Sequence, residues 1–469
     1  MRISKSRYIA GLQCHKHLWN LVNDPTRISA PDAFTRQMFE QGHRVGSIAK
    51  ERYPNGYEVP YGALTTTITR TRDVLSGRIP LFEASFARDD AYCRIDILVP
   101  RDDTWDIIEV KSSTRVKDTH LEDVAFQKWV ASRTIPIGRC MLMHIDTSYV
   151  RNGAIDPQRI LAVEDITDAV TAIEPLVEER VKEMIAIIDG PEPDVPIGTQ
   201  CTNPHSCPLI EHCWKDVPNA SILTAYRMPR EEAFEHYHAG RGYANLDLSG
   251  KHAIQQEAHL TNERHVDRKT LGRWLDRLEE PIICLDFETA SSAVPFADGM
   301  RPYEQIPFQY SAHVSTDHYE FLSEELDPRR SIAESLLTLP KGTLLAHNAS
   351  FEKRIIKALA DRFDDLRDDL LALNERMLDL MTPFANFAVY DPKQNGSCSM
   401  KAILPAFGIA DYKTLTISSG DQAAANWLRL VTEKISTAEK ESIRRSLLEY
   451  CRLDTYGMVR ILEELRRHR

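Results

Sequence analysis

The sequence lacks several features that would place it in a broad class at once. Its 469 residues contain no apolar run approaching the ~18 residues of a membrane-spanning helix, and the start lacks the apolar core of a signal peptide. Basic residues are not in excess, since 58 Lys and Arg face 69 Asp and Glu for a net charge of −11. We therefore expect a cytoplasmic protein without a membrane partner, and we exclude one that coats nucleic acid by bulk charge.

Further absences narrow the function classes. There is no internal repeat, no low-complexity tract and no nucleotide-binding P-loop (G-x4-G-K-[ST]), so any ATP-driven unwinding of nucleic acid would come from a separate helicase. The nine cysteines are an odd number, which argues against a disulfide framework and favours metal ligands and core thiols. Apolar residues make up 42% and charged residues 27%, which is typical of a globular protein.

The residues that are present form two α/β patterns separated by a polar, helix-forming stretch. Three prolines in PEPDVPIGTQ follow the amphipathic stretch 169–188, and an apolar strand begins abruptly after Pro281. Strands precede helices on both sides, which predicts a mixed α/β architecture. We expect a first unit over residues 1–215, a helical connector over 216–280 and a second unit over 281–469.

The segment 80–113 predicts three strands separated by polar turns, and it carries a group of charged residues. Asp96 lies in the second predicted strand, and Glu109 and Lys111 lie two apart in the third, so that these two side chains share a face. Carboxylates suit Mg²⁺ or Mn²⁺, and a lysine beside them can orient water or stabilise charge on a phosphate. The alternative is a solvated charge pattern on an edge strand.

Together with the amphipathic helix HLEDVAFQKWVASR that follows, this pattern resembles the PD-(D/E)XK nuclease superfamily, specifically its RecB-like branch. The resemblance implies a restriction-endonuclease-like core that hydrolyses phosphodiester bonds. It also implies that Asp96 and Glu109 are metal ligands, that Lys111 is the catalytic lysine, and that Gln127 is a supporting site residue.

One position departs from that pattern. Relatives often carry a histidine ligand on an N-terminal helix, whereas QGHRVGSIAK has Gly46 at the position that we align with it. His43 lies three residues away, about one helical turn, and is a candidate substitute. The alternative is that His43 is a surface histidine.

A second group consists of cysteines. QCTNPHSCPLIEHCW places Cys201, Cys207 and Cys213 at C-x5-C-x5-C in a predicted non-helical loop with no apolar period. Thiolates at this density bind Zn²⁺ or an iron–sulfur cluster, and Cys14 in AGLQCHKHLW is the best candidate for a fourth ligand. Zinc sites more often contain C-x2-C pairs or histidine, which favours a cluster, although His205 and His212 nearby keep zinc as the alternative. The other cysteines, Cys451 among them, are interpreted as core thiols.

The distant N-terminal cysteine and the later triplet around a RecB-like core resemble the iron–sulfur nucleases, which include AddB-type recombination nucleases and the related CRISPR-adaptation nucleases. The triplet spacing is wider here than is common in those proteins. The resemblance implies a 4Fe–4S cluster held by Cys14, Cys201, Cys207 and Cys213. Because the metal would close the chain between its first and last ligands into one loop, its loss should loosen the fold of the first unit.

A third group consists of acids in the last part of the chain. IICLDFET ends in Asp286 and Glu288, whose i, i+2 spacing puts both carboxylates on one face of a strand. LLAHNASFEKRII places Glu352 one turn into a helix, and SLLEYCRLDTYGMVRIL places Tyr450 and Asp454 at i, i+4. Such a set is what a two-metal phosphodiester site requires, although each motif alone is compatible with a surface turn or helix.

In this order, the three motifs resemble those of DnaQ-like 3′–5′ exonucleases of the RNase H fold, in the subclass with tyrosine in the third motif. The resemblance implies Asp286, Glu288, Glu352 and Asp454 as ligands of Mg²⁺ or Mn²⁺, and Tyr450 as a catalytic residue. Glu352 stands where those exonucleases normally have aspartate. Because the unperturbed pKa of tyrosine is about 10, Tyr450 is expected to orient the water rather than take its proton.

From residue 281 onward the chain also resembles an uncharacterised bacterial family, catalogued as a domain of unknown function. RMLDL, SMKAILP and the LLEYCRLDT helix carry this resemblance, which implies functional roles for Asp379 and Lys401. By chemistry alone, Asp379 is equally a helix-end acid, and Lys401 is either structural or a phosphate contact.

The sequence therefore predicts a metal-dependent nuclease with two nuclease domains. We expect it to act on DNA with single-stranded ends, including 3′–5′ exonucleolytic digestion, in DNA repair, recombination or phage defence. The alternatives are a nucleic-acid-binding or scaffold protein with one or both sites inactive, and a nuclease that acts on RNA. RNA and DNA differ at the 2′-OH, and no residue in the sequence indicates which is bound.

Overall fold

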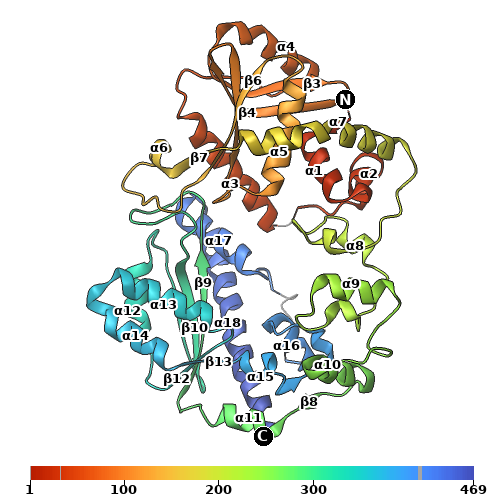
Figure 1. The fold of residues 1–469 in the computed structure, drawn as a ribbon. Coiled ribbons are helices and arrows are strands. Elements are labelled where there is room, and N and C mark those ends of the chain that lie inside the picture. Colours follow the sequence, from red (N-terminus) through yellow and green to blue (C-terminus); the bar gives the residue numbers. More distant parts are fainter. Residues whose placement is uncertain (1, 32, 410–414) are drawn as a thin grey trace. The chain divides into compact units, whose positions relative to one another are not determined.

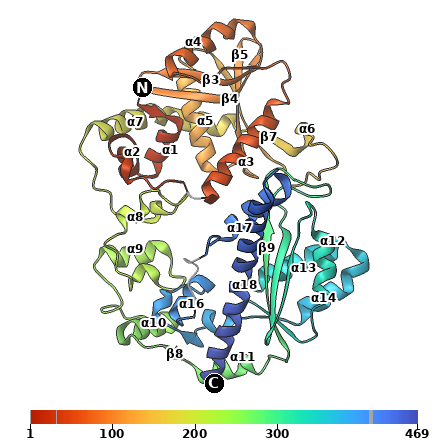
Figure 2. The same ribbon diagram turned by 180° about the vertical axis from the view of Figure 1, so that it is seen from behind.

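The computed structural model describes residues 2–31, 33–409 and 415–469. Its architecture is mixed α/β, and the chain divides into two compact units (Figures 1 and 2). The first unit runs through Asp216 and also includes Ser292–Glu304, and the second comprises Val217–Ser291 and Gln305–Arg469. None of the helices in the described residues has the length and apolarity that crossing a bilayer demands.

The first unit is built on a seven-stranded sheet in which β2-β3-β4-β5-β6-β7 are neighbours and β1 pairs with β4. Its strands are β1 Ile3–Ser4, β2 Tyr57–Glu58, β3 Leu81–Arg88, β4 Ala91–Arg101, β5 Thr104–Lys111, β6 Ile137–Ile145 and β7 Leu161–Asp165. Strands β3, β4 and β5 form an antiparallel meander, β6 runs parallel to β5, and β7 returns antiparallel to β6. The three strands predicted over residues 80–113 are therefore confirmed.

Helices cover both faces of this sheet. They are α1 Lys5–Gln13, α2 His15–Asn23, α3 Ala33–Lys50, α4 Leu64–Val74, α5 Asp118–Ala131, α6 Pro157–Ile160, α7 Thr167–Asp189 and α8 Ile210–Cys213. Because strand side chains alternate, Ile107 enters the core formed with α1, α5 and α7, whereas Ile108 enters the core formed with α3. Glu109 and Lys111 share the parity of Ile107, which directs them toward α5.

The second unit contains a five-stranded sheet of order β11-β10-β9-β12-β13 and a separate pair, β14-β8. Its strands are β8 His265–Val266, β9 Ile282–Ala290, β10 Ile306–Val314, β11 Asp317–Leu322, β12 Thr343–Ala346, β13 Met377–Asp379 and β14 Val389–Tyr390. Strands β9, β10 and β11 are antiparallel neighbours, and β12 is parallel to both β9 and β13.

The helices of the second unit are α9 Arg230–His238, α10 Gly250–Thr261, α11 Arg268–Leu275, α12 Arg329–Leu336, α13 Ser350–Arg362, α14 Arg367–Glu375, α15 Thr382–Ala385, α16 Met400–Ala406, α17 Gly420–Thr432 and α18 Thr437–Arg467. The segment expected as a connector holds α9, α10 and α11 and, from Val217 onward, lies within this unit. Leu285 and Phe287 of β9 enter the core formed with α12 and α13. Alternation therefore turns Asp286 and Glu288 toward α18, which packs on β9 and β10.

Candidate active sites and cysteine site

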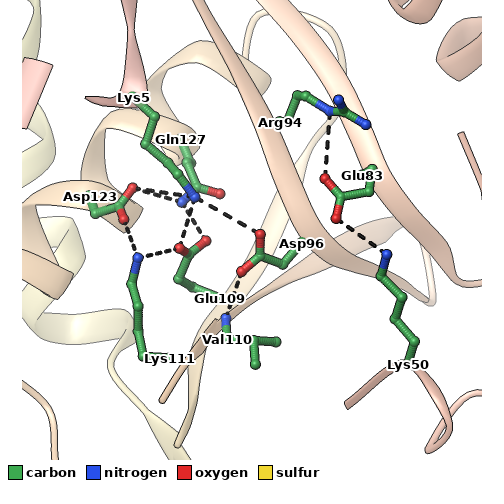
Figure 3. A network of polar contacts seen from close by, with 10 residues as sticks. All are labelled: Lys5, Lys50, Glu83, Arg94, Asp96, Glu109, Val110, Lys111, Asp123 and Gln127. Atoms are coloured by element: carbon green, nitrogen blue, oxygen red, sulfur yellow. Dashed lines mark hydrogen bonds and ion pairs between the residues drawn. The ribbon is translucent and has the colours of Figure 1, made fainter. Parts of the chain in front are cut away.

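Figure 3 shows a polar network on the α5 side of the first unit's sheet. Lys111 Nζ lies 2.6 Å from Glu109 Oε1, and Gln127 of α5 donates a hydrogen bond of 2.7 Å to Glu109 Oε2. Asp96 of β4 accepts a 2.9 Å hydrogen bond from the main-chain N–H of Val110. The structure therefore brings together the four residues that the sequence indicates for this site.

Two residues that the sequence reasoning missed complete the network. Asp123 lies one turn before Gln127 on α5, and its carboxylate accepts hydrogen bonds from Lys111 at 2.7 Å and from Gln127 at 3.0 Å. Lys5 reaches Glu109 Oε1 at 2.8 Å and lies 3.9 Å from both Asp96 and Asp123. The i, i+4 spacing of Asp123 and Gln127 is a readable signal, whereas no local pattern links Lys5 to residues so distant in the chain.

The charges in this network shift its pKa values in opposite directions. Burial and the charge of Glu109 raise the pKa of Asp96 to about 7. Burial alone would raise the pKa of Glu109, but Lys111 and Lys5 outweigh it and hold this pKa well below its usual range. Burial would lower the pKa of Lys111, but Glu109 and Asp123 outweigh it and raise this pKa. Lys111 is therefore a permanent cation and not a proton acceptor.

Lys5, Asp96, Glu109 and Lys111 line a cavity of about 590 Å³, which residues of α3 also line. The lining residues from α3 include Phe39, Gly42, His43, Gly46 and Lys50, of which Phe39 and His43 are exposed. The position that we align with the family's histidine, Gly46, thus borders the same cavity as the acids, and so does the candidate substitute, His43. A Cβ atom at Gly46 would meet nothing within 4 Å.

The four cysteines singled out from the sequence line one small cavity in the first unit. Cys14 separates α1 from α2, and Cys201 and Cys207 are buried. The sequence predicts a non-helical loop around Cys201, Cys207 and Cys213, but this segment contains two short helical pieces. Cys201 ends a 3₁₀ turn, and Cys213 ends α8. The N–H of Gly198 donates to Cys201 Sγ at 3.4 Å. Burial, followed by the neighbouring cysteines, raises the pKa of Cys207 to about 11.

In the second unit, the carboxylates of Asp286 and Glu288 and the thiol of Cys451 lie within 4.8 Å of one another. Burial, followed by the charges of Asp454, Glu288 and Glu352, raises the pKa of Asp286 well above its usual range. Burial, followed by the charges of Asp454, Asp421 and Glu352, raises the pKa of Glu288 likewise. The four acids predicted from three separate motifs therefore interact as one cluster, and Cys451 is an addition that the motifs did not indicate.

Glu352 is held in the first turn of α13, where its side chain is 3% exposed. Its Oε2 has no hydrogen-bond partner among the described residues, and burial followed by the charge of Asp379 raises its pKa to about 8. Asp379 ends β13 and accepts hydrogen bonds from the main-chain N–H groups of Asn348 and Met381, at 2.9 and 2.8 Å. Asp379 thus fixes the loop that precedes α13 and positions Glu352.

Three further side chains border this cluster. Tyr450 is buried, and burial followed by the neighbouring acids raises its pKa, so its hydroxyl stays protonated. Lys401 donates a 2.8 Å hydrogen bond to the main-chain oxygen of Ser418, and its charge opposes the rise in the pKa of Glu288. Asp421 adds to that rise from the first turn of α17, and no sequence motif marks it.

The family comparison covers part of the chain, most of it in the second unit. Residues 283–399 match the family described as "Domain of unknown function (DUF2779)". The chain is also 25% identical over 223 residues to the "Uncharacterized protein MG366 homolog" of Mycoplasma pneumoniae (strain ATCC 29342 / M129 / Subtype 1), an alignment covering 42% of this chain and 33% of that protein. The chain thus spans about a third of the length of that curated relative. No solved structure matches the chain. These similarities support an uncharacterised family and bring no activity with them.

Proposed function

We propose that the chain is a divalent-metal-dependent nuclease with two hydrolytic sites, one in each unit. The first unit would act as a RecB-like PD-(D/E)XK nuclease, and the second as a DnaQ-like exonuclease that digests from a free 3′ end. The substrate that we propose is DNA with single-stranded ends, made available by a separate helicase, in DNA repair, recombination or phage defence.

The observation that carries this proposal is the crowding of carboxylates in the second unit. Asp286, Glu288, Glu352 and Asp454 come from β9, α13 and α18, and burial followed by the charges of the other three acids raises the pKa of Asp286. Neighbouring carboxylates repel one another when they are ionised, and a bound divalent cation removes this repulsion. Cleavage of a phosphodiester by two metal ions needs such a set of acids around one point.

The protein's own groups have separable roles in such a reaction. A divalent cation held by the acids would lower the pKa of a bound water and neutralise charge on the phosphate. Tyr450, which stays protonated, can donate a hydrogen bond that orients the attacking water. Lys111 is a permanent ammonium placed to stabilise negative charge on a phosphate, and Gln127 fixes the orientation of Glu109.

We also propose that the four cysteines hold a 4Fe–4S cluster, with zinc as the alternative. The cysteine, histidine and acidic residues that line this cavity are all cysteines, since neither His205 nor His212 lines it. The hydrogen bond from the Gly198 N–H to Cys201 Sγ is of the kind that tunes a metal-bound thiolate. The last residue of α1, Gln13, donates 2.8 Å hydrogen bonds to the main-chain oxygens of Gln200 and His205, which secures the N-terminal helix to the cysteine loop.

One observation favours a second candidate, in which the first unit binds nucleic acid without cleaving it. Both carboxylate oxygens of Glu109 already accept hydrogen bonds, Oε1 from Lys5 and Lys111 and Oε2 from Gln127. Oε1 of Glu109 accepts from both Lys5 and Lys111, so a metal ion that binds this oxygen must displace one of the two lysines. Cleavage that uses Oε1 as a metal ligand therefore requires a rearrangement of the first site.

End-labelled single- and double-stranded DNA and RNA, incubated with Mg²⁺ or Mn²⁺, test the proposal. We expect Asp286→Asn to stop release of mononucleotides from a free 3′ end, and Lys111→Ala to stop the remaining cleavage. A 3′-phosphorothioate end should protect the substrate from the Lys111→Ala protein. If both variants leave every product of the wild type unchanged, the assignment of the sites is wrong, and exclusive digestion of RNA would replace the proposed substrate.

A further inference from the structure

Lys5 occupies an unusual place in the first site, because it is the second ammonium on one carboxylate oxygen. Glu109 Oε1 lies 2.8 Å from Lys5 Nζ and 2.6 Å from Lys111 Nζ. Asp96 Oδ1 and Asp123 Oδ1 each lie 3.9 Å from the same Lys5 nitrogen. Figure 3 shows the Lys5 side chain entering the network from outside the strands, with its nitrogen among the three acids.

Lys5 is not needed to satisfy the hydrogen bonding of Glu109 and Asp123. Lys111 and Gln127 together bond both oxygens of Glu109 and both oxygens of Asp123. Two ammonium groups on one oxygen also repel each other. What Lys5 adds is a positive charge between Asp96 Oδ1 and Glu109 Oε1, on the two acids that the resemblance to PD-(D/E)XK nucleases implies as ligands of a divalent cation.

The attachment of Lys5 lets its side chain move while its backbone stays in place. Its main chain follows β1, where Ile3 and Ser4 pair with β4, and the Ser4 hydroxyl accepts a 3.2 Å hydrogen bond from the Arg7 N–H to cap α1. The Lys5 side chain remains 26% exposed and lines the 590 Å³ cavity. Its long flexible stem can therefore withdraw the ammonium into that cavity without loss of the helix.

We propose that Lys5 is a positioning residue of the first site whose ammonium competes with the divalent cation for the carboxylates of Asp96 and Glu109. The inference rests on the proposed function. It adds to that function that the divalent cation must take the place of an ammonium group before the acids of this site can bind it. Lys5 holds the acids together until the cation displaces it, after which its charge lies in the cavity where substrate phosphate would enter. Removing the charge of Lys5 should therefore tighten metal binding.

Direct Mn²⁺ titration of the full-length protein, followed by the EPR signal of free Mn²⁺, tests this competition. Asp286→Asn serves as the background, so that binding at the second unit does not obscure the first, and Asp96→Asn identifies the first-site component. Lys5→Met removes the charge and keeps the stem, Lys5→Gln is a second neutral variant, and Lys5→Arg retains the charge.

Lys50→Met is the matched control. Lys50 lines the same cavity, but its ion pairs are with Glu58 at 2.9 Å and Glu83 at 3.3 Å. We expect Lys5→Met and Lys5→Gln to bind Mn²⁺ at least about 10-fold more tightly, because a unit charge within contact distance of the ligands is lost. Lys5→Arg should bind no more tightly than the parent, and Lys50→Met should stay within about 2-fold because of its distance and solvent screening.

The outcomes separate this inference from the proposed function. If Asp96→Asn abolishes the binding but the neutral Lys5 variants bind Mn²⁺ no better than the parent, Lys5 does not compete and the metal site itself stands. If Lys50→Met tightens binding as much as Lys5→Met, the effect is one of bulk charge and the inference also fails. If Asp96→Asn leaves Mn²⁺ binding unchanged, the first-site metal and the competition for it are both refuted.

Discussion

The thiol of Cys451 lies 3.7 Å from the main-chain oxygen of Asp286 and 3.8 Å from its carboxylate oxygen Oδ2. This cysteine is fully buried, and burial followed by the charge of Asp286 raises its pKa well above the usual range. The sequence predicts a core thiol here, whereas the structure places this thiol beside the acids of the second unit. A protonated thiol leaves those acids to a hard cation, but a softer metal can displace the proton and gain a ligand.

Zn²⁺ should therefore inhibit digestion by the second unit, and Cys451→Ser should weaken that inhibition by about 10-fold, the scale found for groups that surround a bound metal. Cys284→Ser is the control, because Cys284 is a buried thiol of β9, the strand that carries Asp286 and Glu288, and lies outside the acid–thiol group. The measurement is the Zn²⁺ concentration that halves 3′ mononucleotide release at fixed Mg²⁺. Equal inhibition of wild type and Cys451→Ser would rule out the thiol as a ligand.

Tyr450→Phe should slow 3′–5′ digestion by about 10²-fold, the low end for a positioned proton-handling group. The acids would keep their arrangement, because the ring remains and only the hydroxyl is lost. Since burial and the neighbouring acids raise the pKa of Tyr450, its hydroxyl does not titrate in the pH range of the assay. The pH–rate profiles of variant and wild type should therefore run parallel, and an inflection lost with the hydroxyl would show that Tyr450 acts as a base.

Metal-free protein should become less stable as pH rises from about 5 to about 8. The folded-state pKa of Glu352 is about 8, whereas an unfolded glutamate has a pKa of about 4.3. The folded state thus binds more protons between these values, and its stability falls as pH rises through the folded pKa. Glu352→Gln should flatten the dependence of melting temperature on pH, and Glu375→Gln, at an exposed position of α14, should not. A slope that Glu352→Gln leaves unchanged would show that Glu352 is already ionised.

Local patterns sufficed for much of the fold and for most of the site residues. The strands around Asp96 and Glu109 alternate between two cores and are separated by polar turns, so a window of a few residues defines them. The helix that carries Tyr450 and Asp454 follows from its apolar period in the same way. Within these elements, which residues share a face is a matter of simple geometry.

Residues whose partners are distant in the chain could not be found in this way. Lys5 joins the first site from a different helix at the start of the chain, and Asp421 joins the second from α17. Each sits in an ordinary polar helix turn that carries no motif. Cys451 has the apolar setting of a core thiol, and only the packing of α18 on β9 reveals that its neighbours are acids.

Cys207→Ala should remove the colour of protein purified without oxygen, and with it the iron and sulfide, about four of each per chain for a 4Fe–4S core. Melting temperature should fall as well, because metal binding and folding are coupled. Cys140→Ala is the control in the same unit, since Cys140 is a buried thiol outside the cysteine cavity. That variant should be somewhat less stable, because the smaller side chain leaves a void in the core, and it should keep all of the iron. If the purified protein contains stoichiometric zinc and shows no visible absorption, the four cysteines form a zinc site and not a 4Fe–4S cluster.

Gly46→His should give the first site a further metal ligand. A Cβ atom at Gly46 meets nothing within 4 Å, and the position borders the cavity that contains Asp96 and Glu109. Gly42→His is the matched control, because Gly42 lines the same cavity one turn earlier on α3 and is equally open. Both substitutions remove a helical glycine, so both should raise the melting temperature slightly.

Only Gly46→His should then bind Mn²⁺ more tightly, by about 10-fold, when the Asp286→Asn background isolates the first site. Neutral imidazole is a good ligand for such ions, so the gain should vanish below a pH of about 6, where histidine is protonated. If Gly42→His gains as much Mn²⁺ affinity as Gly46→His, the effect does not depend on where along α3 the imidazole lies. No gain in either variant would show that α3 does not approach the ion, and that the role assigned by resemblance to the position of Gly46 does not apply to this chain.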